Sequence, residues 1–203
     1  MSNLRYIIAG KRGLLQITGE DAQDFLQGMI SNDMDQVSAE KSVYAALLTP
    51  QGKFLFDFVV LRDLARTGYL LDCDADRLPD LQRRLSMYKL RADVTLEDVS
   101  ETLGVALCYG DGLTGGEPAG QTSTWGKGVK LVDPRLAGLG LRVVLPCDGM
   151  ADFLEAEGYV AASEDDWEAH RLALGVPEAG RDILIEKSFP LECSFDELGA
   201  ISY

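Results

Sequence analysis

The clearest pattern in this sequence is a pair of apolar runs, within residues 43–62, on either side of Thr49-Pro50-Gln51-Gly52. Proline presets the first central position of a turn, and glycine accepts a left-handed or bulged backbone, so the pattern predicts a β-hairpin. Apolar side chains occupy both alternating sets of positions in the second strand. Such a strand is typically central in its sheet and covered on both faces.

Asp57 is the lone carboxylate of that second strand. Alternation predicts one face made of Phe54, Phe56, Phe58 and Val60, and an opposite face made of Lys53, Leu55, Asp57, Val59 and Leu61. A buried carboxylate must meet a cation or donor, take up a proton, or border a ligand cavity. The pattern leaves two interpretations open: a simple ion pair at a strand edge, or a functional carboxylate.

Helical periodicity and capping motifs predict three helices. The first follows Thr18-x-x-Asp21 and ends near Ser31-Asn32-Asp33, the second carries Leu78, Leu81, Leu85 and Tyr88, and the third follows Ser163-x-x-Asp166 and ends at Gly175-Val-Pro177. Asn32 and Asp33 also suit a helix C-cap or turn. Lys89 and Arg91 suit a helix C-terminus, although Tyr88-Lys-Leu-Arg91 equally suits an anion-binding edge. A lone helical histidine such as His170 is more often a packing or surface residue than a catalyst.

The remaining pattern predicts short strands, a short helix and one long loop. Strands are expected at Leu4–Ala9, Leu14–Ile17, Gly68–Asp72, Ala92–Val99, Leu103–Cys108 and Leu141–Leu145, a short helix at Met150, Phe153 and Leu154, and a surface loop from Gly110 to Gly128. Strands, hairpins and helices alternate without regular βαβ spacing. The sequence therefore predicts an α+β fold with largely antiparallel sheets.

Composition narrows the function classes. The formal net charge of -14 and the pI near 4.4 argue against direct nucleic-acid binding, because no basic stripe exists to contact phosphates. Four scattered cysteines and one histidine argue against a metal site made by this chain alone. The N-terminal residues lack the features of a signal peptide or organelle presequence, and no segment is long enough to cross a membrane. We therefore expect a cytoplasmic protein without a membrane partner.

Five stretches together resemble one known family. They are Phe25-Leu-Gln-Gly-Met-Ile-Ser-Asn-Asp33, Leu47-Leu-Thr-Pro-Gln-Gly-Lys-Phe-Leu-Phe-Asp57, Tyr88-Lys-Leu-Arg-Ala-Asp-Val94, His170-Arg-Leu-Ala-Leu-Gly-Val-Pro-Glu178, and Phe189-Pro-Leu-Glu192 through Leu198-Gly-Ala-Ile-Ser-Tyr203. Their order and residues resemble the YgfZ-type folate-binding family, which is related to the aminomethyltransferase, or T-protein, of the glycine cleavage system. The resemblance runs from end to end of the chain.

The resemblance implies the aminomethyltransferase folate-binding fold, with two ferredoxin-like subdomains and usually a small C-terminal β-barrel. We expect a first subdomain at residues 1–100, a second at 101–162, and a return segment at 163–203. It also implies tetrahydrofolate or a one-carbon derivative as ligand, and a role in iron–sulfur cluster assembly or repair that affects tRNA modification indirectly. Its implied partners are folate and iron–sulfur assembly or client proteins.

The resemblance also implies site residues. It places Asn32, Asp57, Tyr88, Arg91 and Arg171 at the folate, with Asp57 as the candidate catalytic carboxylate and no metal ligand. The alternative function is a tetrahydrofolate-dependent aminomethyltransferase, so enzymatic activity is left open. A third interpretation is a plain interaction module without a working ligand site.

Three departures from the family patterns bear on that choice. Phe56 stands where the transferases carry the first aspartate of a pair, and Ala173 stands where they carry a pterin-facing glutamate. Both favour the accessory role over the transferase. The family's Lys-Gly-Cys-Tyr-x-Gly-Gln-Glu motif follows a segment like Leu198–Tyr203, which is where this sequence stops, so we expect a chain that lacks that motif and the barrel.

Overall fold

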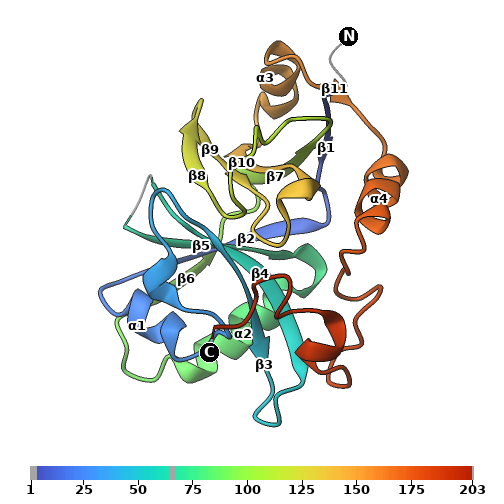
Figure 1. Ribbon diagram of the computed structural model, residues 1–203. Helices are drawn as coiled ribbons and strands as arrows, with labels where there is room; N and C mark the ends of the chain where they lie inside the picture. The colour runs from blue at the N-terminus through green and yellow to red at the C-terminus, as the bar shows by residue number, and fades with distance from the viewer. Residues whose placement is uncertain (1–3, 65–66, 203) are drawn as a thin grey trace.

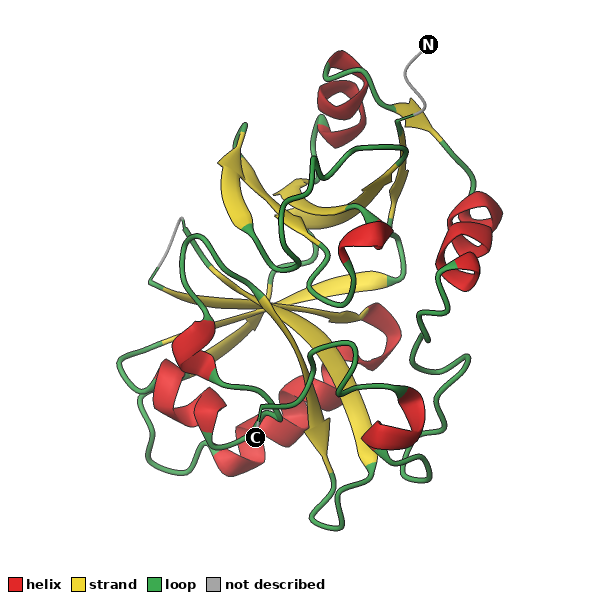
Figure 2. Cartoon of the chain, in the orientation of Figure 1, coloured by secondary structure: helices red, strands yellow, loops and turns green. Residues whose placement is uncertain are grey.

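The computed structural model describes residues 4–64 and 67–202 and builds two β-sheets that share one core (Figures 1 and 2). The five-stranded sheet has the order β3 (Val43–Leu48), β4 (Phe54–Arg62), β5 (Gly68–Asp74), β2 (Arg12–Thr18) and β6 (Thr95–Asp98). The six-stranded sheet has the order β11 (Val160–Ala161), β1 (Arg5–Ile8), β7 (Leu103–Tyr109), β10 (Leu141–Pro146), β9 (Gly128–Val132) and β8 (Thr122–Trp125). Side chains from both sheets, including Val59 and Leu107, pack into a common apolar cluster.

Strand pairing is antiparallel throughout the described ladders except between β1 and β11. This confirms the expected α+β fold with largely antiparallel sheets. The consecutive strands β1 and β2 lie in different sheets, so the turn at Gly10-Lys11 carries the chain from one sheet to the other. Residues 12–98 supply the five-stranded sheet, whereas β1 joins strands from residues 103–161. The division at residues 100 and 162 remains a prediction.

The predicted hairpin is confirmed as the pair β3 and β4. Gly52 has a φ of 79°, the positive value that the turn requires. The register shifts between Leu47 and Leu48, and Phe54 packs with Val59 in the cluster between the sheets, while Leu55 packs on the opposite side. The expected faces are therefore wrong at Phe54 and Leu55, each of which packs on the face predicted for the other, because this irregularity breaks the simple alternation.

Helices cover the outer faces of the two sheets. Leu26 of α1 (Ala22–Gln27) and Leu81 of α2 (Leu78–Tyr88) pack against the five-stranded sheet, and Leu154 of α3 (Met150–Ala156) packs against the six-stranded one. Helix α4 (Glu164–Ala173) stands beside both sheets (Figure 1) and buries Trp167 and Arg171. Short 3₁₀ turns occupy Met34–Gln36, Ala75–Arg77, Ala137–Leu139 and Pro190–Cys193.

The two capping motifs found in the sequence have different outcomes. Ser163 caps α4 as predicted, because its hydroxyl accepts the backbone N–H of Asp166 at 3.1 Å and the Asp166 carboxylate accepts that of Ser163 at 3.2 Å. Thr18 instead ends β2, and α1 begins at Ala22 without a side-chain cap. The Asp21 carboxylate accepts the Asp93 backbone N–H at 2.7 Å, so this tertiary contact replaces the expected local one.

The sequence pattern did not predict two further parts of the fold. Strand β8 lies inside the glycine-rich stretch expected to be a loop, and it pairs with β9. The C-terminal segment bonds the start of β4, where the Phe54 N–H donates to the Ser188 carbonyl at 3.0 Å. It also bonds the segment after α1, where the Ser202 N–H donates to the Ser31 carbonyl at 2.9 Å. Tyr203, the last residue of the matching segment, lies outside the described residues.

The cap of α4 gives a direct stability prediction. Replacing Ser163 by alanine removes the acceptor for a helix N–H, which should lower the free energy of unfolding by about 1 kcal/mol in urea denaturation. Ser123→Ala, in an exposed position of β8, is the matched control and should change it by less than about 0.5 kcal/mol. Equal effects of the two substitutions would contradict the capping assignment.

Candidate functional site

Asp57 is buried, with 7% of its surface exposed, on the face of β4 that looks toward the six-stranded sheet. The Tyr44 hydroxyl donates a hydrogen bond to Asp57 Oδ2 at 2.8 Å. Asn32 donates its side-chain amide to the Tyr44 carbonyl at 2.8 Å and to the Gly199 carbonyl at 2.7 Å. Tyr44 thus joins two of the sequence-predicted site residues, Asn32 and Asp57.

The protonation state of Tyr44 follows from its surroundings. Burial, together with the nearby Asp57 charge and the hydrogen bond to it, raises the pKa of the Tyr44 hydroxyl well above its usual value. Tyr44 therefore remains a hydrogen-bond donor to Asp57 at neutral pH. The carboxylate gains a fixed donor in a place where water reaches it poorly.

A network of buried ion pairs lies next to this contact. Arg12 Nε bonds Asp72 Oδ1 at 2.6 Å, and Arg142 bonds the other oxygen of Asp72. Arg142 also reaches Asp133 Oδ2 at 3.0 Å, and Arg135 Nη2 meets the same oxygen at 2.8 Å. Since Asp72 belongs to β5 and Arg142 to β10, the network connects the two sheets.

The two network carboxylates stay ionised because of their arginine neighbours. Burial alone would raise the pKa of Asp72, but the charges of Arg12 and Arg142 outweigh it and hold that pKa below its usual value. Burial likewise opposes ionisation of Asp133, and Arg135 and Arg142 hold its pKa well below the usual range. Both groups are therefore carboxylates at any pH near neutrality.

Arg12, which belongs to the network, also lines a cavity of about 200 Å³. Its Nε and Nη2 bond Asp72, and within the described residues no acceptor bonds its Nη1. The cavity is lined by Lys11, Arg12, Asp74, Asp76, Glu178, Ala179, Gly180 and Arg181. Its walls therefore offer cationic donors and anionic acceptors side by side. The charge of Asp57, which does not line the cavity, contributes to the raised pKa of Arg12.

Arg171 supports the far wall of that cavity. It is 2% exposed, bonds Glu168 and the Val176 carbonyl, and reaches Asp182 Oδ2 at 2.7 Å. These contacts fix the loop that carries Glu178 and Arg181 toward Arg12. Arg171 acts within this part of the chain as a support, because its guanidinium is already engaged by protein groups.

Tyr88 and Arg91 lie apart from the other three candidates. They stand at the exposed C-terminal end of α2, and α2 packs on the face of the five-stranded sheet opposite to Tyr44. The N-terminal end of α2 is the nearer one to β4, because Arg77 donates to the Leu55 carbonyl at 2.6 Å. Tyr44 thus connects Asn32 with Asp57, and Arg171 supports one wall of the Arg12 cavity. None of the five predicted site residues is among the described residues that line this cavity.

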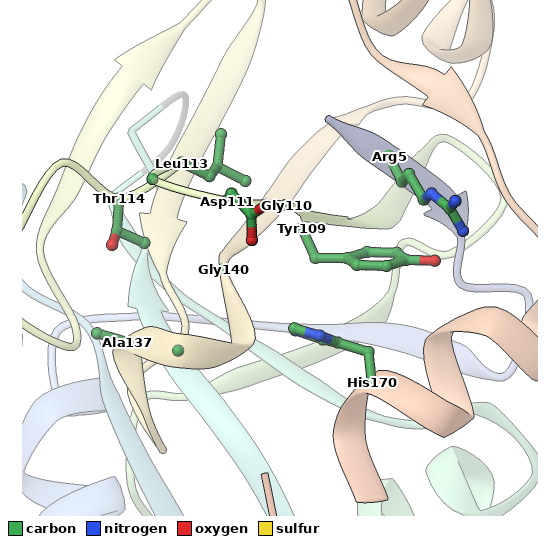
Figure 3. A pocket seen from close by; sticks show the side chains of 11 residues that line it. Arg5, Tyr109, Gly110, Asp111, Leu113, Thr114, Ala137, Gly140 and His170 are labelled. Atoms are coloured by element: carbon green, nitrogen blue, oxygen red, sulfur yellow. The ribbon is translucent and has the colours of Figure 1, made fainter. Parts of the chain in front are cut away.

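A second cavity, of about 380 Å³, adjoins α4 at His170 (Figure 3). His170 points into it, stacks on Tyr109 with ring centroids 4.8 Å apart, and has Nε2 3.3 Å from the Leu139 carbonyl. Asp111 and Thr114 come from the glycine-rich loop after β7. This cavity shares no lining residue with the Arg12 cavity, and the packing of His170 agrees with its expected role as a packing residue.

Sequence reasoning missed Arg12, Tyr44 and the pairing of Asp72 with Arg142. The sequence did carry a signal for both members of the pair, since Asp72 lies in Tyr69-Leu-Leu-Asp-Cys73 and Arg142 in Leu141-Arg-Val-Val-Leu145. Each is the lone charge within its apolar run, the same feature that marked Asp57. Asp72 and Arg142 belong to different sheets, so no local sequence pattern could predict that they pair.

Two kinds of feature, a metal-site cluster and a membrane-spanning helix, were sought in residues 4–64 and 67–202. Within those ranges no cluster of His, Cys, Asp or Glu has the arrangement of a metal site, and no helix is long and apolar enough to cross a membrane.

Comparison with known proteins shows a similar domain and a similar fold. The model of the GCVT N-terminal domain matches residues 11–110. The crystal structure of glycine cleavage system aminomethyltransferase T from Bartonella henselae superposes with a TM-score of 0.78 at 15% identity, covering 96% of this chain and 57% of that one. Residues 11–110 are therefore similar to a GCVT N-terminal domain, and the chain has the aminomethyltransferase fold that the sequence predicted.

Among curated proteins, two relatives carry the same name. The mitochondrial iron-sulfur cluster assembly factor IBA57 of Homo sapiens is 30% identical over 204 residues, which is 95% of this chain and 56% of that protein. The homologue from Mycosarcoma maydis is 29% identical over 203 residues, which is 95% of this chain and 48% of that protein. This chain thus spans about half the length of the curated relatives it matches.

The buried network makes stability depend on acid pH. The pKa values of Asp72 and Asp133 are lower in the folded state than the unfolded value of about 3.9, so their contribution is complete above that pH and is lost as pH falls below it. Urea denaturation should give a free energy of unfolding that declines steadily below about pH 4. Asp133→Asn should be less stable at neutral pH and lose less stability on acidification. A wild-type protein as stable at about pH 3 as at pH 6 would contradict this prediction.

Proposed function

We propose that this chain is a tetrahydrofolate-binding accessory protein of iron–sulfur cluster assembly or repair, of the YgfZ-type branch, with only indirect effects on tRNA modification. The observation that carries the proposal is the match of 95% of the chain to relatives named iron-sulfur cluster assembly factors. The mitochondrial names of these relatives leave the expected cytoplasmic location a prediction.

The Arg12 cavity supports the folate part of the proposal. A pterin ring presents N–H donors and carbonyl and ring-nitrogen acceptors along its edge, and a lining of carboxylates and cations matches both kinds of group. Glu178 and Asp74 would accept pterin N–H groups, and Arg12 Nη1 would donate to a pterin acceptor. The cavity volume of about 200 Å³ is below the usual size for a whole drug-sized ligand, so the rest of the folate would extend outside it.

Tetrahydrofolate supplies a carrier for a one-carbon unit when it is bound. In this proposal Arg12 links the ligand to the buried carboxylates, because it lines the cavity, bonds Asp72 and lies close enough to Asp57 to be affected by its charge. Tyr44 holds Asp57 in place, and Asn32 holds Tyr44. Neutralising Asp57 would change the electrostatic field at Arg12 and so lower the affinity for the ligand.

The aminomethyltransferase fold favours a second candidate, transfer of a one-carbon unit to or from tetrahydrofolate. Asp57 would then be the group that orients or protonates the reacting folate nitrogen. Phe56 and Ala173 stand where the transferases carry carboxylates, and these departures favour the accessory role.

Ligand-linked stability tests the binding part. Because a ligand that binds only the folded protein adds RT ln(1 + [L]/Kd), 5-formyltetrahydrofolate should raise the thermal midpoint, by the equivalent of about 2.7 kcal/mol at a hundredfold excess over Kd. The rise should shrink in Lys11→Gln and Asp57→Asn and stay unchanged in the control Lys127→Gln, which lies outside the Arg12 cavity. A protein that no concentration of the ligand stabilises would instead be the plain interaction module.

Turnover separates the two candidate functions. The accessory role predicts no formation of methylenetetrahydrofolate from an aminomethyl donor by the wild-type chain under conditions where folate binds. Measurable turnover that Asp57→Asn abolishes, with folate binding retained, would establish the transferase instead.

A further inference from the structure

The end of α2 exposes large apolar side chains to solvent. Met87 is 62% exposed, Tyr88 50% and Leu90 89%. Scattered single apolar residues are normal on a protein surface, but these three fall within four consecutive positions. We call residues 87–91 the α2 end patch.

The backbone of the α2 end patch holds Leu90 outward. Leu90 has a φ of 48°, which is uncommon for a residue with a branched side chain and costs conformational energy. The Lys89 N–H bonds the Ser86 carbonyl at 3.4 Å, and the Ala92 N–H bonds the Lys89 carbonyl at 2.8 Å, so the turn is held by backbone contacts on both sides. Glycine or asparagine would fit this conformation with less strain. Stability alone therefore does not account for a leucine here.

Two cations, Lys89 and Arg91, flank this leucine. Within the described residues no ion pair or side-chain hydrogen bond engages Lys89 or Arg91, whereas Arg83, on the same helix, pairs with Asp80 at 2.6 Å. The acidic excess of the chain is large, with 33 acidic residues against 19 basic ones. Two neighbouring unpaired cations beside exposed apolar groups therefore form a local exception to the acidic surface.

We propose that the α2 end patch docks a partner protein through an acidic segment that carries an apolar side chain. The carboxylates of that segment would meet Lys89 and Arg91, and its apolar side chain would pack against Met87, Tyr88 and Leu90. Aromatic, methionine and arginine residues are enriched in protein interfaces, and this patch contains all three kinds. The proposal does not depend on folate binding, because the patch lies at the end of α2 away from the Arg12 cavity.

Charge distinguishes a protein partner from an anionic membrane. At physiological salt, electrostatic attraction reaches about 8 Å, so a short acidic segment senses the local cations more than the distant acidic residues. A membrane is an extended anionic plane that would face much more of a molecule with a net charge of -14. The acidic segment is therefore the occupant that the charges favour.

Fluorescence anisotropy with a labelled acidic helical peptide, bearing leucines on one face, tests the proposal. The peptide should bind the wild-type chain saturably, more weakly as salt is raised, and at least tenfold more weakly to the Lys89→Glu/Arg91→Glu variant. Arg83→Glu is the control at a cation already paired with Asp80, and it should change the affinity by less than threefold. A peptide with lysine in place of every glutamate should not bind.

Leu90→Gly separates docking from folding. Glycine accepts the positive φ, so this variant should keep or raise the thermal midpoint while it loses at least fivefold in peptide affinity. Unchanged affinity in both Leu90→Gly and the double charge reversal would overturn the proposal. So would binding to phosphatidylserine vesicles, but not to the peptide, that the same substitutions abolish.

Discussion

The fold depends on a chain of buried ion pairs between its two sheets. Asp72 on β5 is bonded by Arg12 on β2 and by Arg142 on β10, and Arg142 continues to Asp133. Removing charges from water is costly, and only close pairing with additional hydrogen bonds offsets that cost. Any movement of one sheet relative to the other would leave at least one of these charges unpaired, so the network fixes how the sheets meet.

This constraint also determines the chemistry of the candidate site. Arg12 bonds Asp72 with two of its nitrogens and also lines the adjoining cavity. Tyr44 brings the neutral donor that Asp57 needs on the same side of the five-stranded sheet. A ligand in the cavity would therefore contact a group whose position and charge are set by the contact between the sheets, which is the kind of rigid support that binding sites need.

Local sequence signals predicted the parts of the fold that local interactions decide. The hairpin followed from Pro50 and Gly52, the burial of Asp57 from the two-sided apolar strand, and the start of α4 from Ser163 and Asp166. Thr18 carried an equally good capping motif, yet β-pairing of Thr18 and the contact of Asp21 with Asp93 prevailed. Local motifs do not reveal such competition from distant residues.

The site was predictable only in part for the same reason. Asn32 and Asp57 come together through Tyr44, which the sequence pattern did not single out because a buried tyrosine in a strand is ordinary. The pairing of Asp72 with Arg142 joins residues 70 positions apart. Tyr88 and Arg91 matched a family pattern, but the length of α2 carries them away from Asp57 and leaves them exposed.

The most direct test of this account is hydrogen–deuterium exchange of the whole chain with and without 5-formyltetrahydrofolate. Slower exchange is expected at the three backbone segments that border the Arg12 cavity, residues 10–13, 74–76 and 178–181, and no change is expected at residues 110–114 beside His170. Protection confined to the His170 cavity or to the end of α2, or no protection at saturating ligand, would contradict it.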